Sequence, residues 1–145
     1  MLVVLIVGII AAMVIPSALN TADLQALSAA RMLATDLQYA QDTAITSQTP
    51  VTVTVNPNAE SYFLSNASGT LIHPITKGAY VVDFRSMQGF TAVNVVSANF
   101  GGTGQVSFDE VGTPSQAGSV VIQGGPSVYT VTVSAVTGRV TASSS

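Results

Sequence analysis

The sequence holds few side chains that could carry out catalysis or bind a metal ion. His73 is the only histidine, Pro74 follows it, and the chain has no cysteine. A catalytic or metal-binding histidine needs partner side chains, and the acidic residues are scattered along the chain. We therefore expect His73 to lie in a surface loop or at the end of a strand, and we expect neither an enzyme activity nor a cofactor.

Asp109 and Glu110 are the one adjacent pair of acidic residues. Ca²⁺ prefers such oxygen ligands, but the spacing around this pair matches no calcium-binding loop, so we expect no metal site. The sequence also lacks a Gly-x-Ser-x-Gly nucleophile motif, a phosphate-binding loop and a His-Glu-x-x-His zinc motif. The glycine-rich residues 101–104 precede a strand-like segment and are better interpreted as a turn.

Asn66 begins the tripeptide Asn-Ala-Ser, which fits the acceptor sequence for N-linked glycosylation. The tripeptide lies where we expect a turn. Such tripeptides are common by chance, and their use depends on the source of the chain. Asn66 is therefore a candidate glycosylation site and nothing stronger.

The composition argues against a nucleic-acid-binding surface. The formal net charge is −3, and only 8 % of the residues are charged. DNA binding requires several basic side chains on one face, whereas the four basic residues of this chain are spread along it. They are Arg31, Lys77, Arg85 and Arg139. We therefore expect no nucleic acid partner.

The N-terminal segment is an apolar run long enough to be a membrane anchor. Residues 1–15 contain no polar side chain, and the first charged residue is Asp23. About 20 apolar residues span a bilayer as a helix. A secretory signal peptide would show a basic residue ahead of the apolar stretch, and none precedes Leu2. We expect a membrane helix in a chain whose leader has already been removed.

After Pro16 the helical character persists but becomes amphipathic. Residues 17–48 contain no glycine or proline and are rich in good helix formers. Their apolar residues recur at helical spacing, and we expect this predicted stripe to pack on the β domain. The predicted stripe consists of Leu24, Leu27, Ala30, Leu33, Ala34, Leu37, Ala40 and Ala44. We expect one helix from Met1 to about Ser47, which ends before Pro50.

From Pro50 onward the period of the sequence changes from 3.6 to 2. Val51, Val53 and Val55 alternate with threonines, and further short runs follow, separated by glycine and proline. This pattern predicts an antiparallel sheet domain. The later expected strands span residues 61–66, 70–75, 79–84, 92–100, 105–111, 119–124, 128–136 and 139–143.

The fold class expected from these segments is α+β, with a long N-terminal helix and a C-terminal antiparallel β-sheet domain. We expect a hydrophobic anchor at residues 1–22, an amphipathic helix half at residues 23–48 and the β domain at residues 49–145.

This arrangement resembles type IV pilins and the pseudopilins of type II secretion. The segment from Leu2 to Leu19 is similar to the body of their N-terminal region, with Gly8 in mid-run and Ile15-Pro16 followed by small and polar residues. Residues 37–44, a Leu-x-x-Ala-x-x-x-Ala helix end that leads to Thr-Pro-Val, resemble the GspH/FimT type, as does the ending at residues 129–143.

The resemblance implies a structural subunit of an extracellular filament, either a type IV pilus or a secretion pseudopilus. Such a subunit is inserted in the inner membrane before the pilus or secretion machinery assembles it into a helical homo-oligomer. The filament core and membrane helix would then be built from Leu2, Val3, Val4, Leu5, Ile6, Val7, Ile9, Ile10, Met13, Val14 and Ile15.

Gly8 and Pro16 weaken the helix between them, because glycine lowers helix propensity and proline removes a hydrogen bond. We expect part of residues 8–15 to be stretched out of helical form in a filament. The alternative is a continuous helix with a mild kink at Pro16.

Type IV pilins also carry an assembly glutamate ahead of this segment. Alignment on Gly8 and Pro16 places that glutamate before Met1, and Leu5 cannot pair with an amine. We therefore expect the glutamate to precede the sequence.

Two other functions remain open. One is a minor pseudopilin, at a filament tip or in DNA uptake, although the C-terminal region offers DNA only Arg139. The other is a membrane-anchored monomeric β domain that acts as an adhesin.

Overall fold

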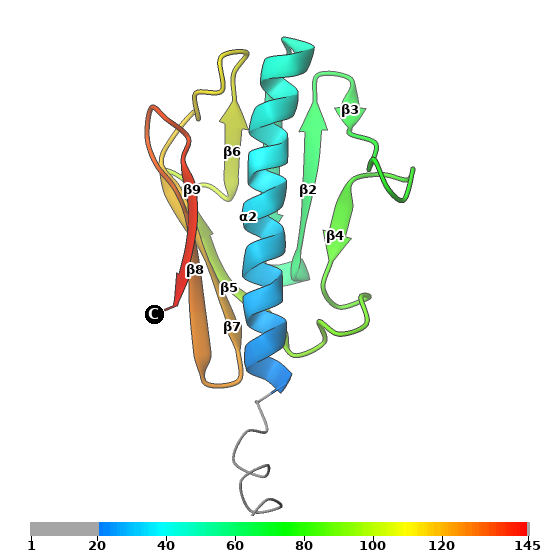
Figure 1. The fold of residues 1–145 in the computed structure, drawn as a ribbon, viewed down its shortest axis with the longest axis vertical. Coiled ribbons are helices and arrows are strands. Elements are labelled where there is room, and N and C mark those ends of the chain that lie inside the picture. Colours follow the sequence, from blue (N-terminus) through cyan, green and yellow to red (C-terminus); the bar gives the residue numbers. More distant parts are fainter. Residues whose placement is uncertain (1–20, 145) are drawn as a thin grey trace, which may run out of the picture.

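The computed structural model of the chain describes residues 21–144. The segment expected to form the anchor and filament core, including Gly8 and Pro16, lies outside the described residues. Among the helices that are described, none is long and apolar enough to cross a membrane. The described part consists of one long helix laid along two antiparallel sheets (Figure 1), which confirms the expected α+β class.

Helix α2 spans Thr21–Ser47, and its interior is free of glycine and proline as its sequence predicts. Its C-terminal end is closed by local hydrogen bonds. The side chain of Gln48 donates a 2.6 Å hydrogen bond to the carbonyl of Ile45, one of the last carbonyl groups, which lack partners within the helix. The hydroxyl of Ser47 donates a 2.6 Å hydrogen bond to the carbonyl of Thr43. Gln48 then takes a left-handed φ of 53°, which turns the chain out of the helix.

The first sheet is built around the alternating segment after Pro50. Its strand order is β3-β2-β1-β6, and β4 also pairs with β2. In β1 every second residue is buried, and Val53 lies opposite Leu64 on one side and Val106 on the other. The strands are β1 (Val51–Asn56), β2 (Ser61–Asn66), β3 (Gly69–Thr70), β4 (Val81–Asp83) and β6 (Gln105–Phe108). A short 3-10 helix, η2 (Pro57–Ala59), joins β1 to β2.

The second sheet contains the C-terminal strands in the order β5-β7-β8-β9, all antiparallel. A bulge between Val95 and Ser97 shifts the register of β5 against β7. The strands are β5 (Val93–Asn99), β7 (Gly118–Gly124), β8 (Ser127–Val133) and β9 (Val140–Ser144).

The strand expected at residues 70–75 does not form. Only Gly69–Thr70 is a strand, and Ile72 makes an isolated bridge with Ala79. The chain instead folds back on itself, since the amide of Lys77 donates to the carbonyl of His73 at 2.9 Å. Pro74 within the segment has no amide to donate to a ladder, which explains the failure.

Helix α2 packs on both sheets, and it runs the length of the domain between them (Figure 1). Leu33 and Leu37 on the helix are fully buried. Aromatic side chains from both halves of the domain are fully buried as well. The helix comes unusually close to the end of β7. A Cβ atom at Gly124 would lie 2.2 Å from the carbonyl oxygen of Ala22 and 2.7 Å from the Cβ of Ala26, so glycine is needed there.

Candidate functional site

His73 lies in the loop between β3 and β4, where its side chain forms hydrogen bonds with the loop itself. Its Nδ1 atom accepts hydrogen bonds from the amides of Ile75 (3.1 Å) and Thr76 (3.3 Å), and its ring packs 4.4 Å from that of Tyr80. Among residues 21–144, no group of three or more histidine, cysteine or acidic side chains could hold a metal ion.

Asp109 and Asn66, two other polar residues considered in the sequence, accept hydrogen bonds from backbone amides of the turns in which they lie. One oxygen of Asp109 accepts hydrogen bonds from the amides of Val111 (3.0 Å) and Thr113 (2.8 Å). The side-chain oxygen of Asn66 accepts one from Ser68 at 2.9 Å, at the end of β2. Asn66 stays a candidate glycosylation site, on a half-buried side chain.

The predicted stripe on α2 largely faces the sheets. Five of its residues are buried, and Leu27 and Ala34 are half-buried at its margin. The buried residues of α2 are Ala26, Ala29, Ala30, Leu33, Asp36, Leu37, Ala40 and Ala44. Two alanines and one aspartate therefore belong to the buried face although the sequence pattern did not include them.

The packing predicted for Leu24 does not hold, since its side chain is 45 % exposed. The reason is helical geometry. Leu24, Leu27 and Ala30 are three residues apart, and at about 100° per residue each such step stops about 60° short of a full turn. Leu24 is thus rotated by about 120° from Ala30, onto the outer face of the helix.

Asp36 is the one buried charged residue in the described chain, with 8 % of its surface exposed. Its carboxylate links the helix to the first sheet. The hydroxyl of Tyr62, on β2, donates to Oδ2 at 2.5 Å, and the hydroxyl of Tyr80, just before β4, donates to Oδ1 at 2.7 Å. Tyr39 of the helix stacks on Tyr80 with ring centroids 5.3 Å apart. We call Asp36, Tyr62 and Tyr80 the carboxylate clamp.

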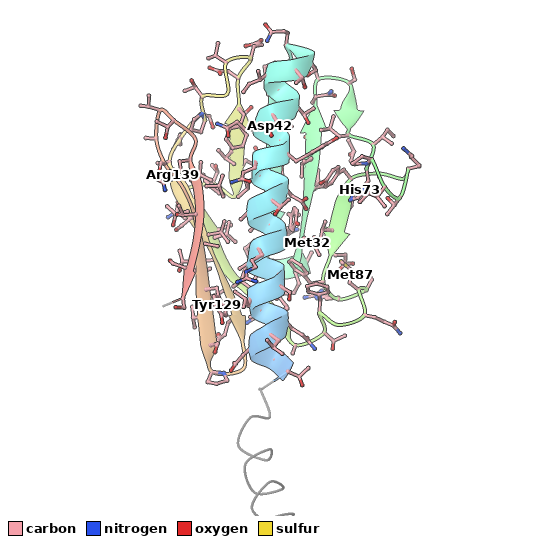
Figure 2. All side chains as sticks on the ribbon, viewed as in Figure 1. Met32, Asp42, His73, Met87, Tyr129 and Arg139 are labelled. Carbon is pink, nitrogen blue, oxygen red and sulfur yellow. The ribbon has the colours of Figure 1, made fainter. Side chains whose placement is uncertain are left out.

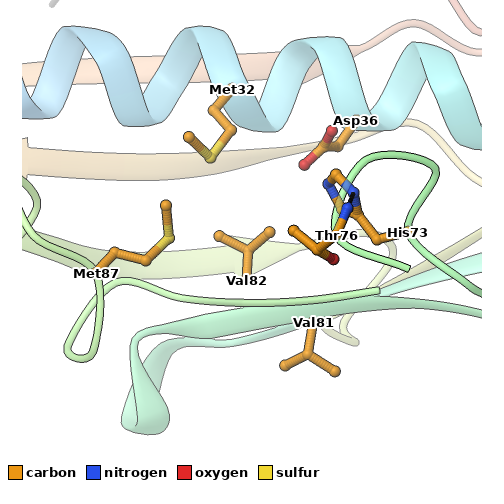
Figure 3. Close-up of a pocket in the computed structure, with 7 residues that line it drawn as sticks. All are labelled: Met32, Asp36, His73, Thr76, Val81, Val82 and Met87. Carbon is orange, nitrogen blue, oxygen red and sulfur yellow. Dashed lines mark hydrogen bonds between the residues drawn. The ribbon is translucent and has the colours of Figure 1, made fainter. Parts of the chain in front are cut away.

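A cavity of about 340 Å³ lies beside the carboxylate clamp (Figure 3). Its side chains divide by polarity. Met32, Val82 and Met87 gather toward one end, and Asp36, His73 and Thr76 toward the other (Figure 3). Val81 completes the lining. Each oxygen of Asp36 accepts a hydrogen bond from a tyrosine, which ties α2 to β2 and to the segment before β4.

The carboxylate clamp also changes the acidity of its tyrosines. Burial raises the pKa of Tyr62 well above its usual value near 10, and the charge of Asp36 and the hydrogen bond to it raise this pKa further. Burial likewise raises the pKa of Tyr80, together with its hydrogen bond to Asp36 and the charge of that carboxylate. Both hydroxyls therefore stay protonated where free tyrosine ionises.

We expect the chain to lose stability in alkali. Above about pH 10 the unfolded chain releases two phenolic protons that the folded chain keeps, so the stabilisation present below that pH is lost as the pH rises. Measurement of the unfolding free energy at about pH 8 to 12 should show this decline. It should be shallower in Tyr62→Phe, which lacks one of the two shifted phenols. A level profile in the unsubstituted chain would contradict the expectation.

A second polar contact fixes the C-terminal half of α2. The side-chain nitrogen Nε2 of Gln41 donates hydrogen bonds to the carbonyls of Gly112 (2.8 Å) and Thr137 (3.1 Å). These carbonyls belong to the loop after β6 and to the β8–β9 turn. Figure 2 shows the two sides of the helix, with His73 and Met87 toward β4, and Tyr129 and Arg139 toward β8 and β9.

Comparison with known proteins gives a family match and a fold match. The family model described as the type II transport protein GspH matches residues 29–138. This range includes most of α2, the first sheet and the second sheet except β9. Among curated proteins, none has a sequence that matches the chain.

Two solved structures share the fold. The type IV minor pilin FimU of Pseudomonas aeruginosa is 19 % identical, with a TM-score of 0.57, over 81 % of this chain and 91 % of that one. The minor pseudopilin EpsH from the type 2 secretion system of Vibrio cholerae is 12 % identical, with a TM-score of 0.60, over 83 % and 96 %.

Proposed function

Because the chain belongs to the GspH family of type II transport proteins, we propose that it is a structural subunit of an extracellular pilus or pseudopilus filament. The observation that carries the proposal is the position of the apolar run. Residues 1–15 lack any polar side chain and precede α2 in the sequence. The buried face of α2 packs against the two sheets of its own domain. A segment that is apolar on all sides must be buried in lipid or among other apolar surfaces.

The apolar run would serve both environments in turn. It would anchor the chain in the inner membrane, from which the pilus or secretion machinery would assemble it, and would then pack against the same segment of other subunits. Residues 2–15 of the run provide eleven large apolar side chains, and burial of each is worth about 1.5–3 kcal/mol. Heterologous contacts that do not close on themselves produce an open helical filament. Part of the segment between Gly8 and Pro16 is proposed to be stretched out of helical form in the filament.

A minor subunit is the more specific candidate. Both structural neighbours are described as minor components, one of a type IV pilus and one of a secretion pseudopilus. The proposal therefore includes a low copy number, at or near one end of the filament.

The test places one charge in the apolar run and one on an exposed loop. Ile9→Asp in the full chain is expected to reduce recovery in the sheared filament fraction more than tenfold, because a buried carboxylate without a partner is strongly disfavoured. Val111→Asp is the control, at a side chain that is 78 % exposed. Immunogold electron microscopy then shows whether the subunit lines the filament or marks its tip. Normal incorporation of Ile9→Asp, or a chain found only as membrane-bound monomers, would refute the proposal.

A further inference from the structure

Asp36 is a buried acidic residue without a counter-charge. Only 8 % of its surface is exposed, and its hydrogen-bond donors are the neutral hydroxyls of Tyr62 and Tyr80. Among residues 21–144, no lysine, arginine or histidine forms an ion pair with it. Acidic side chains are almost never buried to this extent unless a cation pairs with them. The described part of the chain therefore lacks the cation that such a carboxylate normally has.

The carboxylate also has positions left for further hydrogen-bond donors. A carboxylate accepts hydrogen bonds at about four positions, and the two tyrosine hydroxyls occupy two of them. Asp36 lines the cavity of about 340 Å³, and Figure 3 shows its side chain on the face of α2 that is turned toward the other lining residues. A ligand in this cavity would therefore reach the carboxylate.

The rest of the lining determines which kind of cation fits. Met32, Val82 and Met87 present apolar surface at the end away from Asp36 (Figure 3), and methionine side chains adapt to the shape of an apolar group. An inorganic cation such as Ca²⁺ takes about six or more oxygen ligands, which the carboxylate and the hydroxyl of Thr76 do not provide. A cation that carries an apolar chain matches both ends of the cavity.

The volume and the exposure of the cavity limit the length of that chain. Ligand cavities usually measure about 300–1,000 Å³, so a volume of about 340 Å³ is at the small end of the range. Thr76 in the lining is exposed, and His73 and Met87 are half-buried. The cavity therefore opens to solvent and has room for a short chain only.

We propose that this cavity binds a primary ammonium group on a short apolar chain, with the ammonium on Asp36 and the chain between Met32, Val82 and Met87. The three N–H donors of an ammonium group match the free positions of the carboxylate and the hydroxyl of Thr76. The bound cation supplies the missing counter-charge while the two tyrosines hold the carboxylate in place. A free short amine and a lysine side chain of another protein both have this chemistry.

Nuclear magnetic resonance of isotope-labelled methionine methyl groups tests the proposal in the full chain in detergent micelles. The chain has four methionines, of which Met32 and Met87 line the cavity and Met1 and Met13 belong to the apolar run. Addition of n-butylammonium should shift the signals of Met32 and Met87 to saturation. The signals of Met1 and Met13 report amine that enters the detergent and should not follow the same curve. A shift common to all four signals, or none at Met32 and Met87, would overturn the inference.

The matched probe without charge is n-butanol, which has the same chain with a hydroxyl in place of the ammonium. It should bind at least about tenfold more weakly, because a hydrogen bond to a charged group is stronger than a neutral one. Equal affinity of the two probes would show that the cavity takes up apolar chains without regard to charge, and the proposed site would be wrong.

Three variants separate the charge from the folding of the chain. Asp36→Asn should weaken n-butylammonium binding about tenfold or more. Glu110→Gln makes the same change at an exposed carboxylate and should bind like the unsubstituted chain. Met87→Trp leaves the carboxylate clamp intact and fills the apolar end, so the shift at Met32 should disappear even if Asp36→Asn proves too unstable to measure. Unchanged binding in Asp36→Asn or in Met87→Trp would contradict the proposal.

A peptide with one lysine between alanines distinguishes the two sources of the ammonium group. Tighter binding of this peptide than of n-butylammonium would assign the cavity to a lysine side chain of another protein. Weaker binding would assign it to a free amine.

Discussion

Replacement of Asp36 by alanine is expected to lower the free energy of unfolding by about 2–4 kcal/mol. The substitution removes the shared acceptor of the carboxylate clamp and leaves the hydroxyls of Tyr62 and Tyr80 buried without their partner. Hydrogen bonds to a charged group are stronger than neutral ones, and a buried donor left unpaired costs its full desolvation. Chemical denaturation of the chain in detergent micelles, followed by circular dichroism, measures the change.

Tyrosine substitutions separate the carboxylate clamp from simple packing. Tyr62→Phe and Tyr80→Phe each remove one donor and keep the ring. In a double-mutant cycle with Asp36→Ala, each should lose most of its effect once the carboxylate is absent. An Asp36→Ala chain whose stability lies within about 0.5 kcal/mol of the unsubstituted chain would show that the two hydrogen bonds contribute nothing net.

The second large effect is expected from a pair of leucines on opposite faces of α2. Leu37→Ala should destabilise the chain by about 2–5 kcal/mol, because it leaves a cavity in the core. Leu37 is fully buried, whereas Leu24 is 45 % exposed. Leu24→Ala deletes the same atoms and should cost under about 1 kcal/mol.

The comparison of Leu24 with Leu37 tests the orientation of the helix and not merely its existence. Thermal unfolding of the two variants under identical conditions provides the measurement. Equal losses at both positions would mean that Leu24 is buried in the folded chain and that the assignment of the two helix faces is wrong.

Local regularities made much of this fold predictable from the sequence. The alternation of Val51, Val53 and Val55 matches the buried face of β1, and the glycine and proline residues that follow each strand-like run mark the observed turns. The end of the helix near Ser47 follows from the proline that comes shortly after it. These signals depend on neighbours in sequence, which is why they could be interpreted without the structure.

The exceptions depend on geometry or on distant residues. Leu24 fits a list of apolar residues spaced by three, but such spacing drifts around the helix and carries it to the outer face. The chain reversal at His73 overrides an apolar run that otherwise resembles a strand.

The carboxylate clamp could not be found in the same way. Asp36 is separated by 26 residues from Tyr62 and by 44 residues from Tyr80. By its type alone, Asp36 would be assigned to a solvated helix face. Only the hydrogen bonds from Tyr62 on β2 and from Tyr80 before β4 explain why a carboxylate is buried there.

The position of α2 across both sheets also determines how the domain would bear a mechanical load. The helix contacts β1 and β6 of the first sheet and β7, β8 and β9 of the second, and it is held further by Asp36 and Gln41. These contacts lie side by side along its axis. A pull on the chain at Thr21 would therefore strain them together in shear instead of opening them one after another, so tension would be spread over the whole length of the domain.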